Sequence, residues 1–430
     1  FETWLTFGAG QPPERTLTSL GATDGYVVSV RSDGDVRWAR QVASEGVVKV
    51  QGVARLDDGS SVVAGAFEST AAFAYGDLDE VRLTSAGRAD FFVARFAADG
   101  ELLWVRRAMG DGWDEPRAIA TFADGSSVVT GYTQSGGITF GPGELGETTL
   151  LTDGATGCFT ARYASDGQLL WAKLAGGDAT CTGNDVAALH GGASIVAMRI
   201  EGTMTVGQGE EGEASFTAVG FRDMLLVRLD ADGQVVWTRQ VSNPLRVVPW
   251  GIDAYSDGSF VVTGTTADST TFGPGEADVV EVTPVGFWDI FVARYEANGR
   301  IRWARNLGGE DRDIGRDIAA LRDGSCVVTG RIQGDAIAGV GTRNETFLAS
   351  HGEYDIVLAR YGPDGALLGA ENMGGPLNDW GEALSALRDG SYYLTGNFHE
   401  GVVFEEGTRD EVELLALSAQ DLFVAYSGTR

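Results

Sequence analysis

The sequence repeats itself with a period of 66 or 67 residues, and this regularity constrains its fold more than any other feature. The stretch DIFVARYEANGRIRWARNLGG, which begins at Asp289, has near-copies along the whole chain. The residues that stand in register with Asp289, itself included, are Asp24, Asp90, Gly157, Asp223, Asp289, Asp355 and Asp421. A repeat of this length predicts one architecture built from copies of a single supersecondary unit.

Each repeat contains four short runs in which apolar residues alternate with polar ones. In the best-preserved copy the runs are Asp317–Leu321, Cys326–Ile332, Asp355–Tyr361 and Ala366–Asn372. Such alternation predicts strands, and the Asp-Gly or Asn-Gly dipeptides after the first and third runs predict tight hairpins. No segment carries a sustained apolar stripe at the helical period, so we expect almost no helix.

Repeated four-stranded antiparallel units of about 66 residues predict an all-β protein, a β-propeller, whose single domain spans residues 1–430. The third strand occurs in seven registers, whereas the first and fourth strands occur in six. Phe1–Thr3 matches Phe67–Ser69, the end of a second strand, so the sequence begins in mid-blade. We favour seven blades, with the missing strands upstream of Phe1 in the intact protein; six blades are the alternative.

The repeat resembles the bacterial SBBP-type propeller repeat. The resemblance lies in DGSxVVTG (Asp257–Gly264 and Asp323–Gly330), in DxFVARY (Asp289–Tyr295) and in the tail Trp303–Gly309, and it extends over nearly the whole chain. It implies a propeller fold. Because members of that family are largely secreted or cell-surface proteins, it also implies a secreted, periplasmic or cell-surface location. It implies no particular activity.

The formal net charge is −29, from 61 acidic and 32 basic residues. Such an excess of negative charge argues against nucleic acid and against anionic membrane surfaces as partners, and it favours cations or basic partners. No apolar run approaches 18 residues, so we expect no membrane insertion. The oligomeric state stays open.

Antiparallel connectivity places two kinds of connection at opposite ends of each blade. The tight Asp-Gly turns lie at one end. The other end carries the inter-blade loops and the long connections between second and third strands, such as Thr266–Phe287 and Gln333–Glu353. Variable loops on a rigid scaffold are the usual place for binding, so this long-loop face is the predicted binding face.

The tryptophans divide into two groups. One group recurs at a single position of the fourth strand and is predicted to pack between blades: Trp38, Trp104, Trp171, Trp237 and Trp303. The other group lies at or beside the long-loop face, where an exposed ring could stack on a sugar or anchor a protein; the alternative is packing beneath the loops. These predicted ligand-binding residues are Trp113, Trp250, Trp288 and Trp380.

The inter-blade loops are rich in acidic residues, and in one of them Asp311, Asp313 and Asp317 could offer oxygen ligands to Ca²⁺. The alternative is that each aspartate caps its loop or bonds the neighbouring blade. Cys158 and Cys181 both map to the long-loop face of one blade, so they are predicted to form a disulfide; the alternative is two free thiols.

No catalytic signature is present. The histidines belong to no metal-binding or catalytic spacing, and no nucleophile elbow or phosphate-binding loop occurs. We therefore assign no catalytic residue and lean toward a non-enzymatic secreted or surface propeller that binds a protein or glycan through its long-loop face. The alternatives are a carbohydrate-active enzyme, hydrolase or lyase, with acidic residues at the channel mouth, and a structural or assembly subunit.

Overall fold

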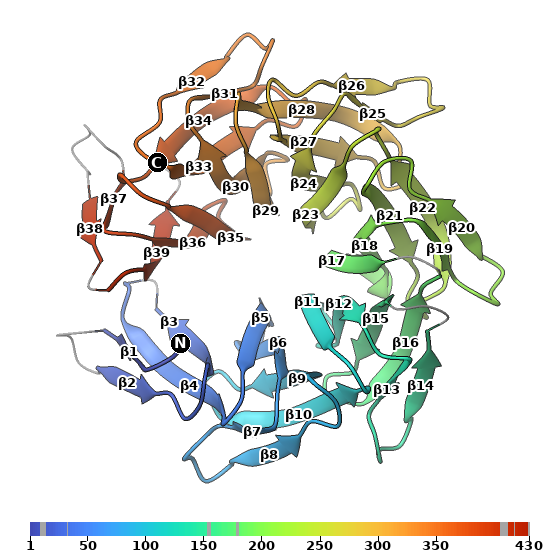
Figure 1. Cartoon of the computed structure of the whole chain (residues 1–430), viewed down its shortest axis with the longest axis vertical. Helices are drawn as coiled ribbons and strands as arrows, with labels where there is room; N and C mark the ends of the chain where they lie inside the picture. The colour runs from blue at the N-terminus through green and yellow to red at the C-terminus, as the bar shows by residue number, and fades with distance from the viewer. Residues whose placement is uncertain are drawn as a thin grey trace. The chain divides into compact units, whose positions relative to one another are not determined.

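The computed structural model describes residues 1–8, 14–31, 33–152, 156–177, 180–404, 412–416 and 418–428. Within these residues the chain is built from strands (Figure 1), and the single helical element is one 3-10 turn, η1 (His190–Gly192). The prediction of an all-β fold with almost no helix is confirmed.

The chain forms two compact units. Unit 1 comprises Phe1–Ser194, Thr203–Phe216 and Leu229–Val236. Unit 2 comprises Ile195–Gly202, Thr217–Arg228 and Trp237–Arg430. The strands up to the end of unit 1's continuous part are β1 (Trp4–Phe7), β2 (Arg15–Thr18), β3 (Gly25–Val30), β4 (Val36–Ser44), β5 (Val48–Arg55), β6 (Ser61–Phe67), β7 (Thr70–Phe73), β8 (Val81–Thr84), β9 (Asp90–Phe96), β10 (Leu102–Met109), β11 (Asp114–Thr121), β12 (Ser127–Thr133), β13 (Gly137–Phe140), β14 (Thr148–Leu151), β15 (Gly157–Tyr163), β16 (Leu169–Ala175) and β17 (Cys181–Ala188).

The boundary between the units falls within the fourth blade. The remaining strands of that blade and its connection are β18 (Ser194–Ile200), β19 (Thr203–Val206), β20 (Ala214–Thr217), β21 (Asp223–Leu229) and β22 (Val235–Val241). The strands that follow in unit 2 are β23 (Val247–Ala254), β24 (Phe260–Thr266), β25 (Thr270–Phe272), β26 (Val280–Val282), β27 (Asp289–Tyr295), β28 (Ile301–Gly309), β29 (Ile314–Ala320), β30 (Cys326–Gln333), β31 (Ala336–Ala338), β32 (Thr346–Leu348), β33 (Tyr354–Tyr361), β34 (Leu367–Met373), β35 (Trp380–Ala386), β36 (Tyr392–Phe398), β37 (Gly401–Phe404), β38 (Val412–Leu415) and β39 (Asp421–Ser427).

Antiparallel four-stranded blades recur at the predicted registers. In unit 1 the complete blades have the strand orders β5-β6-β9-β10 and β11-β12-β15-β16. In unit 2 they are β23-β24-β27-β28 and β29-β30-β33-β34. The first blade contributes its third and fourth strands, β3-β4, and the last contributes β35-β36-β39. With the fourth blade, this makes a β-propeller with seven blades, as favoured from the sequence.

The long connections between second and third strands differ from the prediction. We expected loops on the binding face, but most of each connection is a short β-hairpin. The hairpin β7-β8 pairs with β4, β13-β14 pairs with β10, and β31-β32 pairs with β28. Each hairpin therefore covers the outer strand of the preceding blade, because the exposed edge of that strand offers unpaired N–H and C=O groups. Only the ends of these connections reach the long-loop face.

The repeated tryptophan of the fourth strand packs between blades, as predicted. Trp303 is 3% exposed, and its Nε1–H donates to the Pro363 carbonyl, 3.0 Å away, in the turn of the next blade. The turn glycine Gly365 has φ +78°, and a Cβ there would lie 2.7 Å from the Trp303 ring. Glycine is thus required both by the left-handed backbone and by the ring that lies on it. The equivalent contact, Trp38 on Gly100, occurs in unit 1.

The repeated arginine of the third strand links turns of neighbouring blades. Arg95 pairs with Asp58 at 2.7 Å and donates to the Ser60 hydroxyl within its own blade. It also donates to the Ser165 carbonyl, 2.8 Å away, in the next blade. Because Arg95 is only 7% exposed, these bonds satisfy a buried guanidinium, and its role is structural.

Candidate functional site

The tryptophans predicted to bind ligand are each half-buried, and each has a cationic side chain over its ring. In unit 1, Lys49 Nζ lies 5.9 Å from the centre of the Trp113 ring and 3.3 Å from the Glu115 carboxylate. In unit 2, Arg316 lies 5.3 Å from the Trp250 ring, and Arg331 lies 4.7 Å from the Trp380 ring. These tryptophan rings therefore already make cation–π contacts with lysine or arginine side chains of the same chain.

Trp288 has two guanidinium groups against its ring. The guanidinium carbon of Arg246 is 4.3 Å from the ring centre and that of Arg312 is 4.8 Å away. Two further residues of unit 2, Phe221 and Arg222, stand next to this group, with Arg222 at 4.9 Å from the Phe221 ring. Together with Phe287 these residues are called the Arg–aromatic cluster: Phe221, Arg222, Arg246, Phe287, Trp288 and Arg312.

Backbone contacts fix the cluster at the point where inter-blade loops meet the ends of the long connections. Parallel bridges join Arg222 to Arg246 and Trp288 to Arg312. The buried amide of Asn243 donates to the Arg246 carbonyl at 3.1 Å, and its oxygen accepts from the Leu245 N–H at 2.9 Å. The Asn243 side chain therefore stabilises the loop that carries Arg246.

Two glycines allow this close approach of loop and connection. A Cβ at Gly220 would lie 2.4 Å from the Asn243 carbonyl oxygen, and one at Gly286 would lie 2.3 Å from that of Glu310. Each glycine is followed by an exposed phenylalanine, Phe221 or Phe287. The backbone at these glycines therefore packs directly against the neighbouring loop, and the phenylalanine side chains that follow are exposed to solvent.

A hollow of about 430 Å³ opens beside Trp288, lined among others by Arg246 and by the two phenylalanines. Phe221 is 65% exposed and Phe287 is 68% exposed, while Leu245 in the same lining is 53% exposed. Phenylalanine side chains normally lose most of their accessible surface on folding. Neighbouring exposed aromatic residues around a hollow are a feature of binding surfaces.

Positive charge gathers at the same place. Burial lowers the pKa of Arg246, and the neighbouring arginines Arg222 and Arg199 lower it further, whereas Glu201 acts in the opposite direction. Arg222 Nε pairs with the Glu201 carboxylate at 2.7 Å. In the part of the chain that the structure describes, Arg246 Nε–H has no acceptor. The charged groups that act on Arg246 include Arg199, Arg222, Arg312 and Glu201, and two more carboxylates, Glu310 and Asp311, flank Arg312 in the sequence. The formal net charge of the chain is −29.

A second group of the same kind continues along the long-loop face of unit 2. Arg331 lies between Tyr354, at 4.9 Å, and Trp380, at 4.7 Å. Among the described residues, the Nε–H of Arg331 and the indole N–H groups of Trp250 and Trp380 have no acceptor. These donor atoms are buried, so they are not available at the surface of this face as it stands.

The three predicted calcium ligands have different surroundings. Asp311 is exposed, and Asp313 is buried, where its carboxylate accepts from the backbone N–H groups of Gly309 and Gln333. Burial raises the pKa of Asp313 to about 7. The Asp317 carboxylate accepts a hydrogen bond of 2.7 Å from the backbone N–H of Leu384, in the first strand of the next blade. No group of three or more metal-ligating side chains occurs in the described ranges. Calcium binding stays a prediction.

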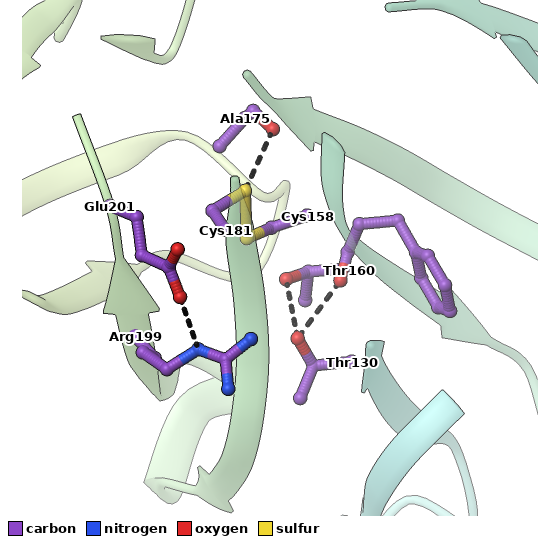
Figure 2. Close-up of a disulfide and its surroundings, with 8 residues drawn as sticks. Thr130, Cys158, Thr160, Ala175, Cys181, Arg199 and Glu201 are labelled. Carbon is purple, nitrogen blue, oxygen red and sulfur yellow. Dashed lines mark hydrogen bonds and ion pairs between the residues drawn. A yellow bond between two sulfur atoms is a disulfide. The ribbon is translucent and has the colours of Figure 1, made fainter. Parts of the chain in front are cut away.

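The structure joins Cys158 and Cys181, the pair for which the sequence predicts a bridge, with Cα atoms 5.5 Å apart. Figure 2 shows this disulfide, with Cys181 Sγ at 3.5 Å from the Ala175 carbonyl oxygen. Gly157 and Cys181 occupy the repeat positions at which Asp289 and Asp313 hold the corresponding loop in another blade. The disulfide thus stands where three other blades have a pair of buried carboxylates, Asp90 with Asp114, Asp289 with Asp313 and Asp355 with Asp379. Cys326 is a free, buried thiol.

Sequence reasoning missed most of the Arg–aromatic cluster, although it identified Trp288. The signal that could have revealed Phe221 and Phe287 is their shared repeat position, which in other blades carries Ala22, Arg88 and Glu353. Since the other blades have a small or charged residue at this position, the fold does not require a large apolar one there.

No protein-family model and no curated protein matches the chain. Among solved structures, it is similar to a protein of unknown function from Bacteroides caccae, at 13% identity over 60% of this chain and 69% of the other, with a TM-score of 0.32. It is also similar to the WD40 domain of Neurospora crassa Pan2, at 9% identity over 80% of this chain and 85% of the other, with a TM-score of 0.35. At these scores neither similarity says anything about function.

None of the helices within the described residues is long and apolar enough to cross a membrane.

Proposed function

We propose that this chain is a non-enzymatic, extracellular or cell-surface binding propeller that recognises a protein or glycan through the long-loop face of unit 2. The observation that carries the proposal is the hollow beside Trp288, with Phe221 and Phe287 exposed at its edge. Aromatic side chains on a rigid backbone contribute large contact area at low entropic cost, which is why they dominate binding hot spots.

Two further observations support the location and the family. The Cys158–Cys181 disulfide suits an oxidising compartment, since disulfides persist in secreted and periplasmic proteins and are rare in the cytosol. The DGSxVVTG and DxFVARY motifs support membership of the bacterial SBBP-type repeat family, whose members are largely secreted or surface proteins.

The test is a binding screen of the whole chain against panels of extracellular proteins and of glycans. Any ligand found is then measured with Phe287→Ala, and with Phe347→Ala as the matched control. Phe347, on the outer hairpin of the same unit, is 63% exposed, so both variants remove a ring of nearly equal exposure. We expect Phe287→Ala to weaken binding at least tenfold, about 1.4 kcal/mol, and Phe347→Ala to leave it unchanged. Equal effects of the two variants would refute the site.

A further inference from the structure

We propose that the Arg–aromatic cluster binds a short polypeptide segment in which carboxylate side chains stand next to apolar or aromatic ones. This inference rests on the binding function proposed above and names the ligand class. It follows from the arrangement of the guanidinium groups, the use already made of the aromatic faces, the exposed phenylalanines and the charge of the whole chain.

The guanidinium groups are positioned before a ligand arrives. Arg246 and Arg312 both stack on Trp288, and a stacked guanidinium keeps its N–H edge free for an in-plane acceptor. Carboxylates match that edge in a bidentate geometry, with hydrogen bonds about twice as strong as those between neutral groups. Arg312 is exposed, so its N–H edge can meet such a carboxylate, whereas the Arg246 Nε–H, which has no acceptor among the described residues, is buried.

The aromatic faces of this region are already covered by cations. Trp288 carries two guanidinium groups, and Arg331 lies over both Tyr354 and Trp380. A sugar ring that stacked on these faces would have to displace these cation–π contacts before it gained contacts of its own. This arrangement favours recognition through the arginines over recognition through tryptophan–sugar stacking.

Within the cluster, Phe287 is the aromatic ring with no cation recorded over it, whereas Arg222 lies 4.9 Å from the Phe221 ring. Phe221 and Phe287 are flanked by two other exposed apolar residues, Val219 at 69% and Val285 at 51% exposure. These side chains offer no hydrogen bonds, so they suit apolar side chains of a polypeptide better than the hydroxyl groups of a glycan. Aromatic residues and arginine at the centre of a patch are also the composition of protein–protein interfaces.

The charge of the chain limits how long an acidic partner can be. With a net charge of −29, the protein repels a long polyanion such as nucleic acid, an acidic polysaccharide or an anionic membrane. A short acidic segment can meet the local arginines, and charges farther away are screened over about 8 Å at physiological salt. The combination favours a short acidic and apolar peptide.

The test measures binding of the whole chain to a short peptide of alternating phenylalanine and glutamate. The comparison probes are the same peptide with glutamine for glutamate, an oligogalacturonate of equal charge, and vesicles containing phosphatidylserine. We expect the acidic peptide to bind tightest, by about tenfold or more, and its affinity to fall as salt is raised.

Arg246→Gln combined with Arg312→Gln should lower the affinity for the acidic peptide at least tenfold, and Phe287→Ala should also weaken it. Arg302→Gln is the matched control, since it removes an exposed arginine that pairs with Glu296 at 3.8 Å on an outer strand. If the double variant melts early, Arg312→Gln alone carries the test, because Arg312 is exposed.

Equal binding of the glutamine peptide, tighter binding of the oligogalacturonate or the vesicles, or full binding by the arginine variants would overturn this inference. A ligand that needs Phe287 but neither Arg246 nor Arg312 would overturn it while leaving the proposed function standing. If no ligand depends on Phe287, the proposed function fails as well.

Discussion

The contact between Trp303 and the next blade gives the sharpest test of how this propeller is held together. The Trp303 ring is 3% exposed, lies tilted against Tyr361 with ring centres 6.2 Å apart, and donates its N–H to the Pro363 carbonyl. Trp303→Ala removes the packing, which costs about 3–5 kcal/mol for a buried tryptophan. About 1 kcal/mol of the total belongs to the hydrogen bond.

Two variants separate these contributions. Trp303→Phe keeps most of the apolar ring and loses the N–H donor, so its cost should be about 1–2 kcal/mol. Phe347→Ala removes an exposed ring from the same unit and should cost less than about 0.5 kcal/mol. The free energy of unfolding is measured from urea denaturation followed by circular dichroism.

The expected order is Trp303→Ala most destabilising, Trp303→Phe intermediate and Phe347→Ala near wild type. If Trp303→Ala unfolded within about 0.5 kcal/mol of the wild-type protein, the assignment of the repeated tryptophan to inter-blade packing would be refuted.

Three further predictions concern turns, the disulfide and pH. Gly365→Ala should lower the melting temperature more than Gly341→Ala, because both glycines have positive φ (+78° and +73°) but only the former lies against a side chain; equal losses would contradict the contact. Reducing the Cys158–Cys181 disulfide should cost about 3 kcal/mol in urea unfolding; an unchanged midpoint after reduction would show that the bridge does not constrain the chain. Asp313 keeps its proton to about pH 7 in the folded state but to about 3.8 when unfolded, so its contribution makes stability fall as pH rises from about 4 to 7. Asp313→Asn should flatten this slope in thermal melts, and an unaltered slope would contradict the assignment.

The fold was predictable because its determinants are local and repeated. Three local signals recur in repeat after repeat: the Asp-Gly turns, the alternation in runs such as Cys326–Ile332, and the tryptophan at the Trp303 position. Each of them indicates the same four-stranded unit. The hairpins on the outer strands were not predictable in the same way. The run Thr70–Phe73 is short, and it pairs with the end of β4, which belongs to another repeat. No residue near Thr70–Phe73 in the sequence therefore predicts this pairing.

The candidate site was predictable only in part, because its members come from separate segments. Trp288 stood out as a tryptophan outside the repeated series. Arg246 and Arg312 lie in different inter-blade loops, and nothing local says that they converge on one indole. The sequence predicted binding on the long-loop face and assigned it to the long connections, which in the structure are mostly hairpins on the outer strands. The binding face stays a prediction.

The most direct test of the account is hydroxyl-radical footprinting of the whole chain with and without the peptide of alternating phenylalanine and glutamate. We expect protection of Phe221, Phe287 and Trp288 on binding, with no change at Phe347. Protection concentrated on the outer hairpins or on the Asp-Gly turns, with the Arg–aromatic cluster as reactive as in the free protein, would contradict it.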